Sequence, residues 1–243
     1  MNVLEACKRL SRINILKTLG EAELETVAAA CAWMRVRQGQ TVVSHLSKER
    51  NIYFISEGAF QVGLVTANGR PVSFRKLEAG SHFGELAALV GVPRTTNVMA
   101  ETAGVIAECP ADAFMALLRT SPAFAETLAI FLARSVIMLS DRVFELAALE
   151  VRFRIYAELL RLARNGETTP EGVLVRNAPT HETLAATVGA QREVVTRELG
   201  LIAEEGIIKS GRRQYLIRDI ARLRDMMQRR AGIAASDQMD WSI

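Results

Sequence analysis

The stretch THETLAATVGAQREVVTRELGLIAEEGII, residues 180–208, decides the fold of the C-terminal part of this chain. Its first half carries an apolar face at helical spacing, made by Leu184, Ala185 and Val188. Gly189 then marks a turn, and a second helical pattern begins near Gln191. Two short helices joined through a glycine turn are typical of the helix-turn-helix arrangement, so the sequence predicts that motif here.

The second of these helices has one apolar face and one polar face. The apolar face is formed by Val194, Val195, Leu199 and Ile202, and the polar face by Arg192, Glu193, Thr196 and Arg197. An arginine can bond bidentately to guanine, and a carboxylate can accept from the amino group of cytosine. The pattern therefore indicates a recognition helix for the DNA major groove. A solvated charged face is the alternative interpretation.

A basic hairpin follows the helices, in the stretch GIIKSGRRQYLIRD at residues 206–219. We expect its cations Lys209, Arg212 and Arg213 to meet DNA phosphates, which set register and not sequence. Residues 176–231 hold 11 Lys and Arg against 7 Asp and Glu, so the basic excess of the chain lies in this part. A basic excess favours a polyanionic partner.

Upstream of this module, glycine is absent between Pro110 and Gly166, and the pattern is helical. Pro122 suits the first turn of a long helix, where a missing N–H is harmless. A 4-3-4-3 spacing along this helix predicts a seam that packs against the same helix of a second subunit. The predicted dimer contacts are Leu128, Leu132, Ser135, Leu139, Arg142, Leu146 and Leu149, with Phe153 continuing the spacing. A helix buried against its own domain is the alternative.

In the first part of the chain, the residue pattern changes from helical to strand-like near Met34. Residues 1 to about 33 read as short helices. From there to Glu108, short β-branched runs alternate with glycines, and Asn68-Gly69 is a hairpin turn signal. Many short strands at regular spacing predict an antiparallel sandwich or jelly roll.

The run VGAQREVVTRELGLIAEEGII resembles the DNA-binding segment of the cyclic AMP receptor protein and fumarate-nitrate regulator superfamily of bacterial transcription factors. Arg192, Glu193 and Arg197 match the Arg-Glu-xxx-Arg pattern of that family, in which they read guanine, cytosine and guanine. The resemblance implies a two-fold symmetric operator with TGTGA-type half-sites. The full predicted DNA-binding set is Thr180, which is also the expected N-cap of the first helix, Gln191, Arg192, Glu193, Thr196, Arg197, Arg212 and Arg213.

A second stretch, GELAALVGVPRTTNV at residues 84–98, resembles the phosphate-binding cassette of the same family. The resemblance implies that Arg94 pairs with a cyclic phosphodiester and that backbone N–H groups near Leu86 and Thr95 bind its other oxygens. Glu85 would accept from the ribose hydroxyl, and Gly84 would leave room for close approach. A plain salt bridge between Glu85 and Arg94 is the alternative.

The base of the nucleotide is less well defined by the sequence. The family places two polar residues of the long helix beside adenine, and the matching positions here are Leu139 and Ser140. Ser140 fits, with each subunit reaching the pocket of the other, whereas Leu139 departs from the pattern. Thr95 is the residue type that cyclic GMP-selective domains use beside their arginine. Cyclic AMP is the first candidate effector and cyclic GMP a close second.

Other sensor chemistries lack support in the sequence. Cys7, Cys31 and Cys109 do not have the clustered spacing of an iron–sulfur site, and His82 alone is a weak haem ligand. We find no metal-spaced cluster, nucleophile elbow or P-loop, which argues against an enzyme. A regulatory subunit of an enzyme and a ligand-independent regulator are the rival hypotheses.

We therefore expect an α+β protein with four parts. Residues 1–121 would form a jelly-roll cyclic nucleotide sensor, residues 122–165 a dimerisation helix and hinge, residues 166–231 a winged helix-turn-helix domain, and residues 232–243 a loose tail. The start of the chain lacks a signal-peptide pattern, and no 18-residue uncharged apolar run is present, so we expect a cytoplasmic protein. Its partners would be double-stranded DNA, a second copy of itself and RNA polymerase, and not a membrane.

Overall fold

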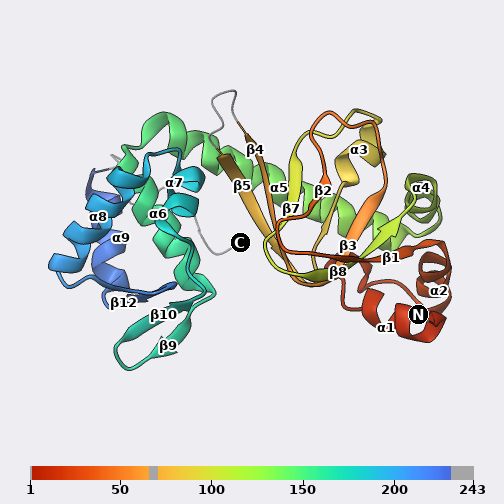
Figure 1. The fold of residues 1–243 in the computed structure, drawn as a ribbon, viewed down its shortest axis with the longest axis horizontal. Coiled ribbons are helices and arrows are strands. Elements are labelled where there is room, and N and C mark those ends of the chain that lie inside the picture. Colours follow the sequence, from red (N-terminus) through yellow and green to blue (C-terminus); the bar gives the residue numbers. More distant parts are fainter. Residues whose placement is uncertain (1, 66–70, 231–243) are drawn as a thin grey trace. The chain divides into compact units, whose positions relative to one another are not determined.

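The computed structural model describes residues 2–65 and 71–230 of the 243-residue chain. The chain divides into two compact units, Met1–Ser135 and Val136–Ile243 (Figure 1). The long helix α5, Pro122–Ala148, contributes residues to both units. Pro122 is its first residue, as the sequence predicted.

The N-terminal unit begins with short helices and continues with strands, which confirms the predicted change from helices to strands. The helices are α1 (Val3–Leu10), a 3-10 turn (Asn14–Leu16), α2 (Glu21–Ala30), α3 (Glu85–Val90) and α4 (Ala111–Thr120). The strands are β1 (Ala32–Val36), β2 (Thr41–Val43), β3 (Ile52–Glu57), β4 (Ala59–Val65), β5 (Pro71–Glu78), β6 (His82–Phe83), β7 (Asn97–Ala100) and β8 (Gly104–Cys109).

These strands form two antiparallel sheets with the orders β1-β8-β3-β6 and β2-β7-β4-β5. Side chains from both sheets, among them Ile55, Phe60 and Ile106, pack together in one core. A second core lies where Ile52 and Phe54 of β3 meet the helices. The predicted antiparallel jelly roll is confirmed. The Asn68-Gly69 turn lies outside the described residues, but β4 and β5 on either side of it pair as a hairpin would.

The predicted dimer seam on α5 needs correction at its two ends. Leu128 is fully buried in the helical core of the N-terminal unit, and Leu149 is buried in the core of the C-terminal unit. A heptad pattern marks an apolar face but does not say what covers it, and here the chain itself covers these two residues. Neither is available to a second subunit.

The middle of α5 does expose apolar side chains. The exposed ones are Ile130, Val136, Ile137, Met138, Leu139, Val143, Phe144 and Leu146. By length and composition α5 could cross a membrane, and in the described residues it is the single helix of which this holds. The same apolar character suits a helix that packs against another helix, and a helix of this kind is weak support for a membrane span.

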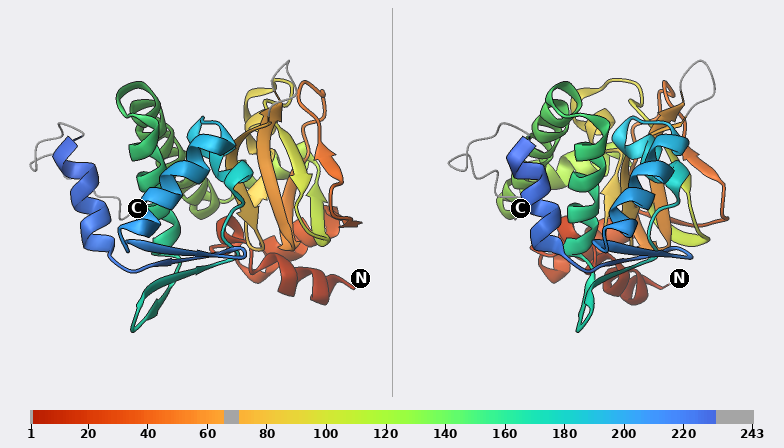
Figure 2. Two further views of the ribbon diagram at one scale, coloured as in Figure 1. Left: turned by 60° about the vertical axis from the view of Figure 1, so that its left-hand side comes forward. Right: turned by 90° about the vertical axis from the view of Figure 1, so that its left-hand side faces the viewer.

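The C-terminal unit combines helices with a small antiparallel sheet, β11-β12-β10-β9 (Figure 2). Its elements are α6 (Val151–Arg164), β9 (Glu167–Thr169), β10 (Gly172–Arg176), α7 (His181–Val188), α8 (Arg192–Glu204), β11 (Ile208–Gly211), β12 (Gln214–Ile217) and α9 (Ile220–Arg230). Residues 165–172 lead into and join the strands of the β9–β10 hairpin. The predicted tail, residues 232–243, lies outside the described residues.

Helix α6 belongs to the core of the C-terminal unit. Phe153, Ile155 and Leu159 are buried there together with Leu184 and Leu199 of the two following helices. The predicted start of the DNA-binding domain at residue 166 therefore leaves out one of its core helices. The sequence pattern of α6 looked like a continuation of α5, which is why it was assigned to the hinge.

Candidate functional site

The stretch around Gly84 forms a tight junction between β6 and α3. Gly84 has a left-handed φ of 96°, which favours glycine, and it precedes the first residue of α3. A side chain there would lie 2.6 Å from Nη1 of Arg94 and 2.8 Å from the carbonyl oxygen of Asn51. The glycine thus lets the backbone approach the arginine closely, and its predicted role of leaving room for a ligand stays a prediction.

Arg94 is 2% exposed, and backbone carbonyls hold its guanidinium. Nη1 donates to the Gly84 oxygen over 3.2 Å, and Nη2 donates to the Asn51 oxygen over 2.6 Å. Its Nε has no partner in the described residues. Burial lowers the pKa of Arg94. No ion pair joins it to a carboxylate in residues 2–65 and 71–230, so the plain Glu85–Arg94 salt bridge does not form.

Glu85 lies on the first turn of α3 and is 7% exposed. Burial raises its pKa, while backbone N–H groups and the charges of Arg75 and Arg94 act in the opposite direction. Two arginines thus act on one carboxylate. The charge of Glu49 also acts on Arg94. A single negative charge close to both arginines would be stabilised by their positive charges. A cyclic phosphodiester carries one such charge.

The other predicted ligand contacts are more open. Leu86 and Thr95 are exposed. Leu139 is 57% exposed on α5, and the neighbouring Ser140 is exposed and donates its hydroxyl to the Val136 carbonyl. Leu139 and Ser140 belong to the C-terminal unit, and their predicted role beside the base stays a prediction.

Two groups near the site were not predicted from the sequence. Asn51 supplies a carbonyl that anchors Arg94, and the guanidinium of Arg75 lies 5.7 Å from the ring centre of Phe131. The imidazole of His82 packs on the same ring at 4.4 Å between centroids. Arg75 was visible in the sequence as a charged residue within a predicted strand. Strand periodicity alone did not show whether its side chain points into the sensor or to the solvent.

His82 provides a pH-dependent prediction. It is 3% exposed, its Nε2 has no partner in the described residues, and burial together with the charge of Arg75 lowers its pKa to about 3. Below about pH 6.5 the unfolded imidazole takes up a proton that the folded one refuses, so folding becomes less stable as the pH falls toward 3. The cost at pH 5 is about 2 kcal/mol.

We expect His82→Leu to remove most of this acid sensitivity. Urea unfolding of the N-terminal unit at pH 8 and pH 5 measures it, with the variant of exposed His45, His45→Leu, as the matched control. The loss of stability between the two pH values should shrink by about 2 kcal/mol in His82→Leu only. Equal acid sensitivity in wild type and His82→Leu would contradict the prediction.

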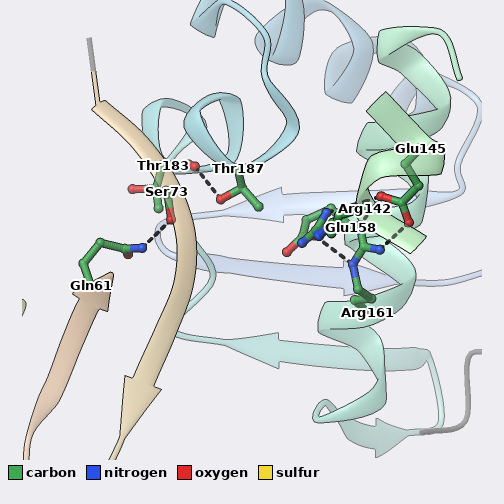
Figure 3. Close-up of polar contacts among 8 residues, drawn as sticks. All are labelled: Gln61, Ser73, Arg142, Glu145, Glu158, Arg161, Thr183 and Thr187. Carbon is green, nitrogen blue, oxygen red and sulfur yellow. Dashed lines mark hydrogen bonds and ion pairs between the residues drawn. The ribbon is translucent and has the colours of Figure 1, made fainter. Parts of the chain in front are cut away.

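In the C-terminal unit, α7 and α8 form the predicted helix-turn-helix. The Thr180 hydroxyl caps α7 by accepting from the backbone N–H of Thr183 over 3.1 Å. Gly189 is left-handed with a φ of 65°, and Gln191 is the N-cap residue of α8. Figure 3 shows a further bond within α7, from the Thr187 hydroxyl to the Thr183 carbonyl. The turn and both helix starts agree with the sequence prediction.

Helix α8 has the two faces that its sequence predicted. Val195, Leu199 and Ile202 are buried in the core of the unit. The exposed face carries Gln191, Arg192, Glu193, Thr196 and Arg197. The hydroxyl of Thr196 is bonded to Nδ1 of His181 over 2.8 Å, so this residue also ties α8 to the start of α7. Arg197 lies 3.7 Å from a carboxylate oxygen of the neighbouring Glu198 and remains exposed.

The hairpin after α8 has the geometry of a wing. Strands β11 and β12 pair from Ile208 to Ile217, and Arg212 and Arg213 form its exposed two-residue tip. Arg213 has a left-handed φ of 54°, and its carbonyl accepts from the N–H of Ala178 over 2.9 Å. Two cations at an exposed tip suit contact with phosphates.

The structure brings together two cysteines that are distant in the sequence. β1 and β8 pair with Ala32 opposite Glu108, and Cys31 and Cys109 are the next residues along. The neighbouring thiol of Cys109, together with burial, raises the pKa of Cys31. Both thiols are free. In the described part of the chain they belong to no group of three side chains that could hold a metal ion.

Comparisons with known proteins agree with this two-part organisation. Residues 33–121 match the cyclic nucleotide-binding domain, and residues 153–226 match the Crp-like helix-turn-helix domain. The second match includes most of α6, in line with its place in the core.

Among full-length relatives, the cAMP-activated global transcriptional regulator CRP of Escherichia coli is 28% identical over 190 residues, covering 77% of this chain and 90% of that protein. The CRP-like cAMP-activated global transcriptional regulator of Mycobacterium tuberculosis is 29% identical over 187 residues, covering 76% and 84%.

Solved structures show the same fold. A transcriptional regulator of the CRP/FNR family from Thermus thermophilus superposes with a TM-score of 0.66 at 25% identity, covering 81% of this chain and 98% of that one. A CooA variant from Carboxydothermus hydrogenoformans superposes with a TM-score of 0.76 at 17% identity, covering 88% and 94%. This chain therefore carries a cyclic nucleotide-binding domain followed by a Crp-like helix-turn-helix domain, and the regulators that it resembles belong to the CRP/FNR family.

Proposed function

We propose that this protein is a homodimeric transcription factor that a cyclic purine mononucleotide switches into a DNA-binding form. Its operator would be a palindrome with TGTGA-type half-sites, and it would act in the cytoplasm together with RNA polymerase. The observation that carries the proposal is the buried, carbonyl-bound guanidinium of Arg94, which has no carboxylate partner in the described residues.

The ligand would enter with its phosphate on Arg94 and its ribose on Glu85. The unpartnered Nε of Arg94, and the charges of Arg75 and Arg94 that both act on Glu85, support this placement. A bidentate pair between a guanidinium and a phosphate is a strong charge-assisted interaction. The E. coli and M. tuberculosis relatives are named as cAMP-activated, which is consistent with a cyclic mononucleotide effector.

Dimerisation would use the exposed apolar residues of α5. Leu139, Val143 and Leu146 recur at spacings of four and three, which is the spacing of a helix seam. In the family pattern, Ser140 of one chain reaches toward the effector of the other. A ligand that contacts both chains can shift the dimer between two arrangements only as far as its affinity for them differs.

The DNA end would use the exposed face of α8, with the β11–β12 wing on the phosphates. Arg192, Glu193 and Arg197 offer two bidentate donors and one acceptor to base edges. In the bound form, the two recognition helices would lie about 34 Å apart, so that they enter successive major grooves on one side of the duplex.

Fluorescence anisotropy with a labelled TGTGA palindrome tests the proposal. We expect cyclic AMP or cyclic GMP to raise the affinity of the full chain for the palindrome while leaving its affinity for random DNA unchanged. Equal affinity for the palindrome with and without any cyclic nucleotide would instead support a ligand-independent regulator.

Arg197→Ala tests the reading of the operator in the same assay. We expect the variant to lose about 1–3 kcal/mol on the palindrome and almost nothing on random DNA, because a base contact is specific to sequence. Arg212→Ala at the tip of the wing is the matched control and should weaken both DNAs alike. If Arg197→Ala also weakens both alike, its guanidinium is only a phosphate contact.

A further inference from the structure

A second arginine of the sensor, Arg75, has no assigned partner. It is half-buried on β5, its guanidinium lies 5.7 Å from the ring centre of Phe131, and its charge acts on Glu85 and on His82. Within residues 2–65 and 71–230, no ion pair or hydrogen bond joins its guanidinium to another side chain. The N–H groups of this half-buried guanidinium could therefore donate hydrogen bonds to a ligand.

A β-bulge lies directly beside Arg75 on β5. Across the β4–β5 hairpin, Val62 lies opposite Arg75 and Gly63 lies opposite Ser73, so that Phe74 is an extra, exposed residue. Bulges change the direction of a side chain and recur beside functional sites. Because of the bulge, Arg75 and Ser73 lie opposite two consecutive residues of β4, Val62 and Gly63.

The side chain of Gln61 fixes the bulge. Its amide Nε2 donates to the Ser73 hydroxyl, a contact drawn in Figure 3, and to the Arg75 carbonyl over 3.1 Å. The backbone on both sides of the extra residue is therefore anchored from β4. An anchored backbone positions the guanidinium at low entropic cost when a ligand binds.

Three charged groups of the sensor, Arg75, Glu85 and Arg94, lie close enough to act on one another. The charge of Arg94 acts on Glu85, and Glu85 in turn is coupled to Arg75. A nucleoside cyclic phosphate has its phosphate, ribose and base in sequence. With the phosphate on Arg94 and the ribose on Glu85, the base is left for Arg75 and the aromatic ring of Phe131.

We propose that Arg75 reads the base and gives the site a preference for guanine over adenine, an inference that rests on the proposed function. A guanidinium has five donors and no acceptor. Guanine presents two acceptors, O6 and N7, on one edge, and arginine bonds to both at once. Adenine presents N7 beside an amino donor, which opposes a second donor. Cyclic GMP, and not cyclic AMP, is then the tighter ligand.

Calorimetry with cyclic GMP, cyclic AMP and cyclic IMP tests this proposal on the full chain. Cyclic IMP has the O6 and N7 of guanine without its amino group, so it isolates the edge that Arg75 would read. We expect wild type to bind cyclic GMP and cyclic IMP about tenfold or more tighter than cyclic AMP. Arg75→Gln and Arg75→Lys should reduce this ratio to below about threefold, because neither offers a bidentate cationic fork.

Lys76→Gln is the matched control, since Lys76 pairs with Glu78 and Glu101 on the exposed side of the same strand. It should keep the wild-type ratio, and thermal unfolding should confirm that all three variants are folded. An equal loss for all three nucleotides in Arg75→Gln, or a wild type that binds cyclic IMP as weakly as cyclic AMP, would overturn the role of Arg75 while leaving the proposed function standing. A wild type that binds none of the three would overturn the proposed function itself.

Discussion

Arg94→Leu is expected to weaken the binding of both cyclic AMP and cyclic GMP by at least about 100-fold. The variant loses a bidentate, charge-assisted contact to the phosphate, and two hydrogen bonds to a charged group are together worth about 3 kcal/mol or more. Since the phosphate is common to all cyclic mononucleotides, the loss should not depend on the base. Calorimetry on the wild type and the variant measures the effect.

The control for this experiment must separate binding from folding, because Arg94 also bonds the carbonyls of Gly84 and Asn51. Arg50→Leu replaces an exposed arginine near the end of α3 and should bind as the wild type does. A thermal scan without nucleotide shows whether the Arg94 variant folds. A nucleotide should then raise the melting temperature of wild type and Arg50→Leu but not of Arg94→Leu. If Arg94→Leu folds and still binds within about threefold of wild type, the phosphate lies elsewhere.

Local patterns made much of the fold predictable. The strands of the sensor, the proline at the start of α5, and Gly189 between α7 and α8 each follow from residue types whose backbone preferences are strong. The two faces of α8 followed from helical periodicity, and the core that buries Val195 confirms them. In these places the local preference and the tertiary packing agree.

The sequence was misleading where a pattern depends on what covers it. The heptad spacing of α5 does not distinguish burial within the same chain from burial against a second subunit. Leu128 and Leu149 are buried within the chain, whereas Leu139 is exposed and could pack against a second subunit. Arg142 was assigned to the seam, but it pairs with Glu145 and Glu158 of its own chain. Periodicity reports an environment and not the partner that provides it.

The candidate site was predictable only in its contiguous part. Gly84, Glu85 and Arg94 lie within one stretch of the sequence, and the structure brings them together. Asn51 directly precedes β3, and Arg75 lies on β5 next to a single extra residue at Phe74, so their places depend on strand pairing. A bulge moves every later side chain to the other face, so periodicity cannot place a residue beyond it.

Glu145→Leu is expected to destabilise the C-terminal unit by about 3–5 kcal/mol. Glu145 is almost fully buried and accepts two hydrogen bonds from Arg161, over 2.6 and 3.0 Å (Figure 3). Arg161 and Arg142 also bond Glu158, over 2.9 and 2.7 Å. Although burial opposes it, these two guanidinium groups lower the pKa of Glu158. Removal of Glu145 leaves two half-buried cations with one anion, and an unbalanced buried charge is costly.

The double variant Glu145→Leu/Arg161→Leu distinguishes charge imbalance from lost packing. It keeps the Arg142–Glu158 pair and restores the balance of charge, so it should recover most of the stability that the single variant loses. Glu205→Leu breaks an exposed pair with Arg222 and should cost at most about 1 kcal/mol. Hydrogen exchange of the α6 amides in urea measures each loss within this unit. Because the cluster joins the end of α5 to α6, a destabilised single variant should also bind the operator more weakly at 37 °C, and the double variant should regain that affinity. A double variant no more stable than the single one would show that Glu145 acts through its shape and not through its charge.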